Sequence, residues 1–320
     1  MSRALRAEIR RLLARRLTLI ALLGVLALIA LFQVQVNQLV TPPSAQEVAE
    51  AQADYEEYLK DWEANHEEWE AECRASGGTE QDCADDKPLP QDWGVAALPY
   101  DEAASTAVTF GAYLAGLVVF VVTASFIGAE VTTGSLANWL TFVPSRRRVL
   151  VSKLLVASGF SLLVGLAVGA LTVAISAVLT GIHGQPLTGL SDIVAMAARG
   201  SLVVGVFGVL GFCVALLTGS TGATIGVLLG GIFVLYVRTI LAFGSRWAQW
   251  LSPWSPEVTL QAVLNRGTTY LVSSGTRGGS EDYATTERSL SLLHGLGYWA
   301  VVLAVLIAVT WHVFRRRDVT

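Results

Sequence analysis

The chain has 320 residues, of which 53% are hydrophobic and 15% are charged, and its mean hydropathy is +0.53. These values exclude an ordinary soluble domain and indicate a protein embedded in a lipid bilayer. The formal net charge of −4 hides a separation of sign, because residues 41–102 hold 18 acidic and 3 basic side chains and the remainder of the chain is basic.

The first predicted element is an amphipathic helix over residues 1–16. Its apolar residues Leu5, Ile9, Leu12 and Leu13 recur at helical spacing, with arginines around them. A basic amphipathic helix of this kind lies at the membrane surface, with membrane lipids as its partner. A simpler interpretation stays open beside it, in which the arginines only fix the orientation of the first span.

Six apolar runs follow along the chain. A helix that crosses a bilayer needs roughly 20 mostly apolar residues. The runs of that length are residues 17–39, 104–129, 154–180, 193–219, 221–243 and 290–314. The predicted fold is therefore an all-α membrane protein with six transmembrane helices. Arg199 and Arg238 lie within two of the runs, toward predicted outer ends where a long side chain reaches the interface.

The basic residues predict the orientation of these spans. Lys and Arg gather in the N-terminal helix, in residues 146–153 and in residues 315–317, and six spans place these three groups on one side. By the positive-inside rule both termini are cytoplasmic. The cytoplasmic segments are then residues 130–153 and 315–320, and the extracellular segments are residues 40–103, 181–192 and 244–289. We expect a multi-pass protein of a prokaryotic plasma membrane.

The extracellular segment 40–103, between the first two spans, is predicted to be an acidic helical cap. Apolar and aromatic residues such as Tyr55, Leu59 and Trp62 share one helical face, and the rest of that helix is acidic. Cys73 and Cys83 flank a glycine-containing turn. In an oxidising exterior we expect them to form a disulfide, and two free thiols are the alternative.

The later connections are short or irregular. Spans four and five are separated only by residues near Ser220, which predicts a tight cytoplasmic hairpin. Residues 244–289 are predicted to form amphipathic helices broken at Pro253 and Pro256, followed by a polar connector. Glycines in the third and fifth spans recur at intervals that allow close helix packing, within one bundle or between two copies.

The sequence contains no complete catalytic or cofactor-binding motif. The stretch from His66 to Glu70 differs from a zinc-protease signature because Glu70 stands where the second histidine is needed. No phosphate-binding loop of the G-x-x-x-x-G-K-[ST] type occurs, so any nucleotide chemistry must reside in another chain. We therefore expect no enzyme activity, no metal and no cofactor in this chain, and no nucleic-acid partner.

The segment from residue 128 to residue 153 combines a glutamate, a glycine turn, an apolar stretch, a proline and a basic cluster. The ordered residues are Glu130, Gly134, Ser135, Leu136, Leu140, Pro144, Ser145, Arg146 and Lys153. This order resembles the cytoplasmic loop of type-2 ABC transporter permeases, and the six-span topology is similar to theirs as well. The resemblance implies a coupling helix that Glu130 begins, that Gly134 turns and that Lys153 follows at the start of the third span. Thr133 departs from the family pattern, since charged residues are common before that glycine.

The resemblance implies a permease subunit of an ATP-driven exporter. Two permeases, identical or paralogous, would enclose the pathway and bind two copies of an ABC ATPase, which would hold ATP and Mg. The pathway would be lined by spans two and five, with Thr109, Ser125 and Thr224 as candidate polar positions. The alternative function is a membrane sensor or scaffold, in which the acidic cap binds a partner and no transport occurs.

Overall fold

The structure is a computed structural model that describes residues 2–75, 87–88, 93, 97–135, 145–242, 250–273 and 285–316. Six helices in this described part are long and apolar enough to cross a membrane. They are α2 (Arg16–Val40), α4 (Tyr100–Thr132), α6 (Arg146–Ile182), α7 (Leu190–Thr218), α8 (Thr221–Ala242) and α11 (Leu292–Arg316). Each predicted apolar run overlaps one of these helices, which is the pattern of a multi-pass membrane protein. The last run was predicted to begin at residue 290, but α11 begins at Leu292 because residues 290 and 291 are in a strand.

The remaining elements are shorter or lie outside the six spans. They are α1 (Ser2–Leu13), α3 (Ala45–Ala75), the 3₁₀ turn η2 (Ser252–Trp254), α10 (Pro256–Leu264) and the strands β1 (Gly267–Ser273) and β2 (Thr285–Ser291). The two strands pair antiparallel, from Gly267 opposite Ser291 to Ser273 opposite Thr285. This hairpin corrects the all-α expectation, which placed a polar connector there. Both strands begin with threonine-rich sequence, and β-branched residues favour extended backbone.

Helices α4 and α7 form the centre of the bundle, and both are buried along most of their length. Small residues allow their backbones to approach closely. A Cβ atom added to Gly211 of α7 would lie 2.3 Å from the carbonyl oxygen of Phe120 in α4, and one added to Gly165 of α6 would lie 2.7 Å from the Cα of Ser201 in α7. The predicted close packing of glycines is thus confirmed for the third span.

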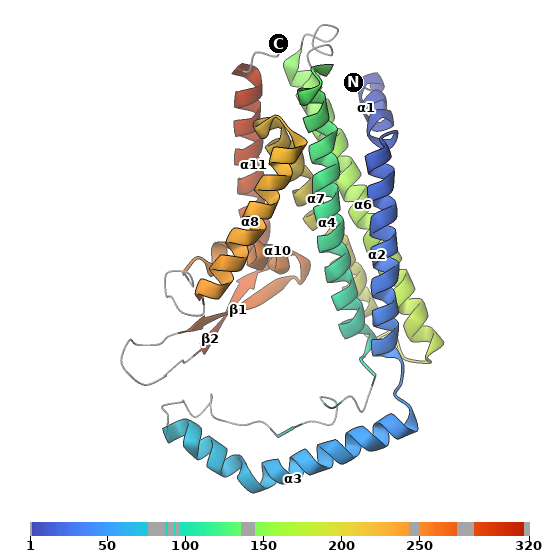
Figure 1. The fold of residues 1–320 in the computed structure, drawn as a ribbon, viewed down its shortest axis with the longest axis vertical. Helices are drawn as coiled ribbons and strands as arrows, with labels where there is room; N and C mark the ends of the chain where they lie inside the picture. Colours follow the sequence, from blue (N-terminus) through green and yellow to red (C-terminus); the bar gives the residue numbers. More distant parts are fainter. Residues whose placement is uncertain are drawn as a thin grey trace.

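Helix α8 is the least buried of the six spans, and Figure 1 shows it leaning away from α4. At one end it follows α7 after a single turn, in which Gly219 has a φ of 75°. The predicted tight turn between these spans is thus confirmed, and its cytoplasmic side stays a prediction. That turn packs on α4, because a Cβ on Gly128 would lie 2.8 Å from the backbone nitrogen of Thr221. The glycines along α8, in contrast, have no described neighbour within 4 Å of an added Cβ.

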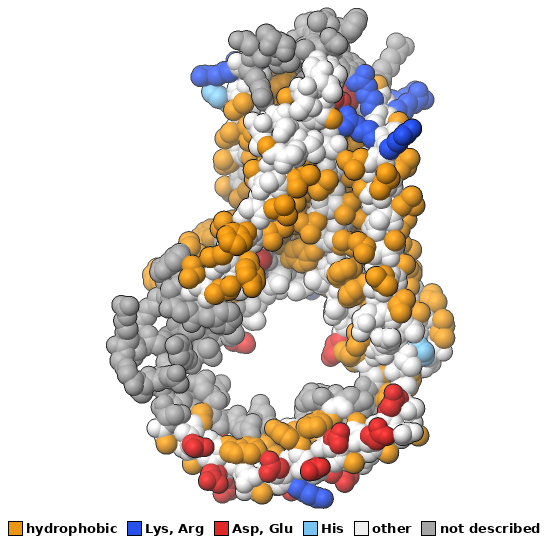
Figure 2. Space-filling model, in the orientation of Figure 1, with side chains coloured by type: hydrophobic (Ala, Val, Ile, Leu, Met, Phe, Trp, Pro, Cys, Tyr) orange, Lys and Arg blue, Asp and Glu red, His pale blue; other side chains and the backbone are white. Residues whose placement is uncertain are grey.

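The two ends of the molecule differ in charge. Both termini lie at one end, and α3 runs across the opposite end (Figure 1). Figure 2 shows basic side chains gathered at the end that carries the termini and acidic side chains along α3. The charge separation seen in the sequence is therefore a separation between the two ends of the helical bundle.

A helix, α1, is present at the N-terminus as predicted, and its placement at the membrane surface stays a prediction. It continues toward α2 after a break at Arg15, which has extended backbone angles. Its faces differ in environment. Leu5 and Leu12 pack with Val122 and Phe126, whereas Ile9 and Leu13 are 45% and 46% exposed. One face of α1 is therefore part of the protein core, and the other is open at the surface.

Candidate functional site

Two residues of the predicted coupling segment meet in a buried ion cluster. Nζ of Lys153, in the second turn of α6, lies 2.6 Å from Oε2 of Glu130, near the end of α4. The same ammonium donates to Oε2 of Glu8 in α1 at 2.8 Å. Arg15, between α1 and α2, places Nη2 3.7 Å from Oε1 of Glu130. We call Glu8, Arg15, Glu130 and Lys153 the four-charge cluster.

The four-charge cluster is shielded from solvent and balanced in charge. Lys153, Glu8 and Glu130 are only 1%, 2% and 5% exposed. Two carboxylates face two cations, so the cluster as a whole is neutral, with the Arg15 side chain 25% exposed at its edge. A buried ion needs such partners. The ring of Phe126 adds a face for both cations, with Lys153 Nζ at 5.0 Å and Arg15 Cζ at 5.4 Å from its centroid.

Arg15 also binds the α4 backbone, because its Nη1 donates to the carbonyl oxygen of Ser125 at 2.7 Å. The cluster therefore joins α1, α4 and α6 at the basic end of the molecule. In this structure Glu130 and Lys153 point into the protein and are unavailable to a protein docking from outside. Any part that they play in coupling acts through the helices that they hold.

The turn after α4 comes four residues after Glu130 in the sequence. Gly134 has a φ of 70°, a conformation that glycine adopts without the steric cost of a Cβ. Thr133 caps the helix, with its Oγ1 donating to the carbonyl oxygen of Ala129 at 2.8 Å. Ser135 lies beside it, 3.3 Å from Thr133 between hydroxyl oxygens. The predicted turn at Gly134 is thus confirmed.

The far end of the segment is fixed to the last helix. Ser145 precedes α6 with extended backbone angles. Nη1 of Arg146 donates to the carbonyl oxygens of Phe314 and Arg315, at 3.1 and 3.0 Å. These carbonyls belong to the last turn of α11, where a cation complements the helix dipole. Residues 146 and 153 therefore anchor α6 to α11 on one side and to α1 and α4 on the other.

Four of the predicted residues lie outside the described residues: Leu136, Leu140, Pro144 and Cys83. Cys73 lies near the end of α3, and its disulfide with Cys83 stays a prediction.

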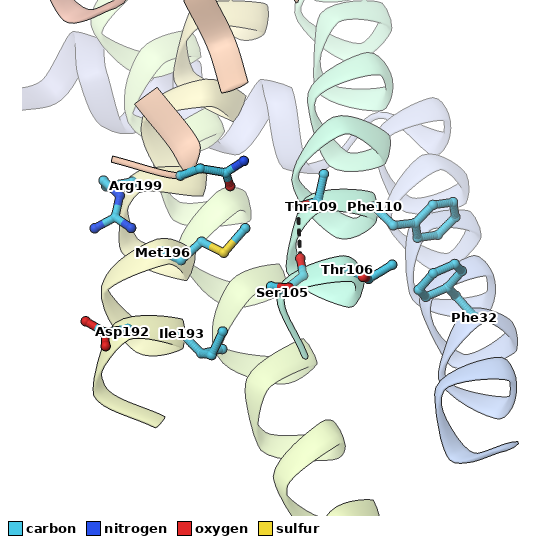
Figure 3. A pocket seen from close by; sticks show the side chains of 10 residues that line it. Phe32, Ser105, Thr106, Thr109, Phe110, Asp192, Ile193, Met196 and Arg199 are labelled. Atoms are coloured by element: carbon cyan, nitrogen blue, oxygen red, sulfur yellow. Dashed lines mark hydrogen bonds between the residues drawn. The ribbon is translucent and has the colours of Figure 1, made fainter. Parts of the chain in front are cut away.

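The three candidate pathway residues do not meet in one cavity. Thr109 lies beside a cavity of about 670 Å³ between α4 and α7, in the half of the bundle nearer α3. Its hydroxyl donates to the carbonyl oxygen of Ser105, and Met196 of α7 points toward the same space (Figure 3). Ser125 lies toward the opposite end, and Thr224 is fully buried beside the α7–α8 turn with its hydroxyl donating to the carbonyl oxygen of Ser220.

Comparison with known families gives one match, over residues 99–320, to a family described as "Protein of unknown function (DUF2705)". The match covers more than half of the chain. The chain belongs to the DUF2705 family. Comparisons with curated proteins and with solved structures found no match.

The DUF2705 match includes Glu130 and Lys153 but begins after α1, α2 and α3. The four-charge cluster therefore combines two residues from the DUF2705 region with two from the segment before it. Sequence reasoning missed Glu8 and Arg15 as members of the site. A signal was present, since Glu8 is the one acidic residue among the arginines of the first 16 residues and shares a helical face with Leu5 and Leu12.

A second ion pair within the DUF2705 region was also missed. Arg238 of α8 forms an ion pair with Glu257 of α10, so this arginine is held by the protein rather than by the membrane interface alone. Nε of Arg199 similarly donates to the carbonyl oxygen of Leu264 at 2.9 Å. Both arginines thus fasten a spanning helix to the segment around α10. Among the described residues, no group of His, Cys, Asp and Glu side chains is placed to hold a metal ion.

Proposed function

We propose that this protein is the membrane-spanning permease subunit of an ATP-driven exporter, and that a separate ABC ATPase drives it. Its basic end faces the cytoplasm and its acidic helix α3 faces the exterior of a prokaryotic cell. Two ATPase copies, with ATP and Mg, act on two permeases that are identical or paralogous. The chain itself needs no cofactor for this role.

One observation carries the proposal: both ends of the segment between α4 and α6 are fixed to several helices at once. Lys153 ties α6 to Glu130 of α4 at 2.6 Å and to Glu8 of α1 at 2.8 Å. Arg146 ties α6 to α11. A force applied to this segment is therefore distributed over four helices instead of bending one. This is the mechanical property that a rigid-body transition driven by a motor requires.

Two further features fit a pathway shared by two copies. Helix α8 is apolar, weakly packed and lined by the glycines Gly222, Gly226 and Gly230, beside which the described chain leaves open space. Small residues at four-residue spacing are the kind of surface on which spanning helices associate. Helix α4 is the other span expected to line the pathway, and its residue Thr109 lines the cavity described above.

The experiment purifies the tagged full chain from native membranes and tests for a co-purifying ATPase. The variant Gly134→Val introduces a β-branched residue at a φ of 70°, which such residues resist. Gly159→Val is the matched control, because a Cβ at either glycine meets nothing within 4 Å and only Gly134 has a positive φ. We expect G134V alone to change the basal ATPase activity while assembly persists.

The scaffold alternative is favoured by α3, a helix of 31 residues without a buried side chain. Trp93 packs on Tyr55 and Tyr58 of this helix, and most of the acidic residues of α3 remain exposed as a docking surface would be. Repeated purification without any nucleotide-binding chain, together with a stable complex that depends on α3, supports the scaffold and contradicts the exporter. Equal ATPase activity in G134V and G159V removes the role assigned to the turn.

A further inference from the structure

The surface of α1 that faces away from the protein carries both charge and exposed apolar side chains. Ile9 and Leu13 are nearly half exposed, and Arg6 and Arg10 are exposed beside them. On a helix, residues 6, 9, 10 and 13 share one face. This face therefore combines an apolar strip with an adjoining pair of guanidinium groups.

Helix α2, which follows α1 after Arg15, also exposes large apolar side chains. Leu17, Ile20 and Leu23 of α2 are 41%, 66% and 66% exposed, and Figure 2 shows the basic side chains of this end lying just beyond such hydrophobic surface. In a bilayer that α2 crosses, Arg6 and Arg10 would lie near the lipid headgroups at this end of the helix. Guanidinium groups bind phosphate oxygens in a bidentate manner.

The opposite face of α1 carries Glu8, whose carboxylate accepts from Lys153 at 2.8 Å inside the protein. Lys153 is shared with Glu130, the residue just before the Gly134 turn. When α1 is docked, Glu8 completes the neutral four-charge cluster. When α1 is displaced, Lys153 loses its partner Glu8, and both Lys153 and Glu130 become more exposed to solvent.

We propose that anionic phospholipid headgroups bind the exposed face of α1 through Arg6 and Arg10, and that this binding stabilises the end of α4 through Glu8. The lipid binds the exposed face of α1, and Glu8 on the opposite face pairs with Lys153. Lipid binding and the Glu8–Lys153 ion pair therefore favour the same position of the helix. The occupant follows from charge complementarity combined with the apolar strip, since a phosphate with acyl chains satisfies both. The inference depends on membrane insertion and not on the proposed ATPase.

The test uses the full chain in nanodiscs of phosphatidylcholine, with and without phosphatidylglycerol. We expect phosphatidylglycerol to raise the unfolding temperature of the wild type, and the double variant R6Q/R10Q to lose at least half of that shift. R147Q/R148Q is the control, because Arg147 and Arg148 are exposed at the same end but the apolar residues Val149 and Leu150 beside them are buried. This control keeps most of the shift.

Hydrogen exchange separates lipid binding from its transmission. In the wild type, phosphatidylglycerol slows exchange in both α1 and residues 128–135, and in Glu8→Gln it slows exchange in α1 only. An equal loss in both double variants, or no lipid shift in the wild type, overturns the binding. Slowed exchange at residues 128–135 in E8Q overturns the transmission. A full shift produced by inorganic phosphate, or by an acidic protein in phosphatidylcholine nanodiscs, shows that the surface serves another anion and also overturns the proposal.

Discussion

The replacement Lys153→Met tests whether the four-charge cluster holds the helix ends together. Methionine keeps the length and apolar stem of lysine but removes the ammonium that Glu8 and Glu130 share at 2.8 and 2.6 Å. At such separations each contact amounts to about 6 kcal/mol of Coulomb attraction in a medium of effective dielectric constant about 20. The loss on mutation is smaller, because an unpaired carboxylate takes up a proton or water. Breaking a buried ion pair costs about 3 to 5 kcal/mol.

The measurement is the free energy of unfolding of the purified protein in mixed micelles, from a titration with SDS. Arg74→Met is the matched control, because Arg74 and Glu70 form an ion pair on the surface of α3 with Arg74 51% exposed. An exposed pair contributes about 0 to 1 kcal/mol. We therefore expect K153M to lose several times more stability than R74M.

A second variant distinguishes an unpaired charge from simple loss of packing. Adding Glu8→Gln to K153M removes one of the two carboxylates left without the ammonium, so the double variant is expected to recover part of the lost stability. The reasoning is refuted if K153M behaves like R74M, or if the effects of E8Q and K153M add without any coupling energy, since neighbours in one network couple by about 0.5 to 3 kcal/mol.

Three further outcomes are expected. Gly211→Ala should destabilise the contact of α7 with α4, because the new Cβ would lie 2.3 Å from the backbone oxygen of Phe120. Gly159→Ala meets nothing within 4 Å and should stabilise α6 by about 0.5 to 1 kcal/mol. The same unfolding titration compares the two variants. Arg238→Gln should lower stability more than R238Q combined with Glu257→Gln, since the double variant leaves no unpaired charge; equal losses would contradict the pairing. Hydrogen bonds from the Ser44 side chain and then its backbone lower the pKa of Glu47 from 4.5, so the first turn of α3 should keep its stability above pH 4.5 and lose it as the pH falls through the lowered value, measured by amide exchange against Glu47→Gln.

The spanning helices could be predicted because each one is specified by its own apolar length. The ends of these helices were predicted less accurately than their positions along the chain. Helix α6 begins at Arg146 rather than at residue 154, since a helix can extend beyond the apolar run when its polar first turns find partners. Lys153 is therefore an internal residue of α6, held by partners that hydropathy does not reveal.

The contacts of the site were beyond prediction because they join distant parts of the chain. Glu8 and Lys153 are separated by 145 positions, and no local pattern pairs them. The turn at Gly134 was predictable, because a glycine after a helix marks a left-handed residue. Arg238 was visible as a charge in an apolar run, but its partner Glu257 lies on α10 after a connection whose path the sequence does not define.

The placement of the four-charge cluster argues for a role in positioning rather than in raw stability. Replacing a buried ion pair by well-packed apolar residues is often neutral or stabilising, so stability alone does not account for four charges at one helical junction. What charges add is a requirement for particular partners at particular distances. Because Lys153 serves Glu8 and Glu130 together, α1 and α4 cannot shift separately without leaving a carboxylate unpaired. The Gly134 turn is therefore linked through these contacts to α1, α4 and α6, and we expect a displacement of any one of the three helices to be transmitted to the other two.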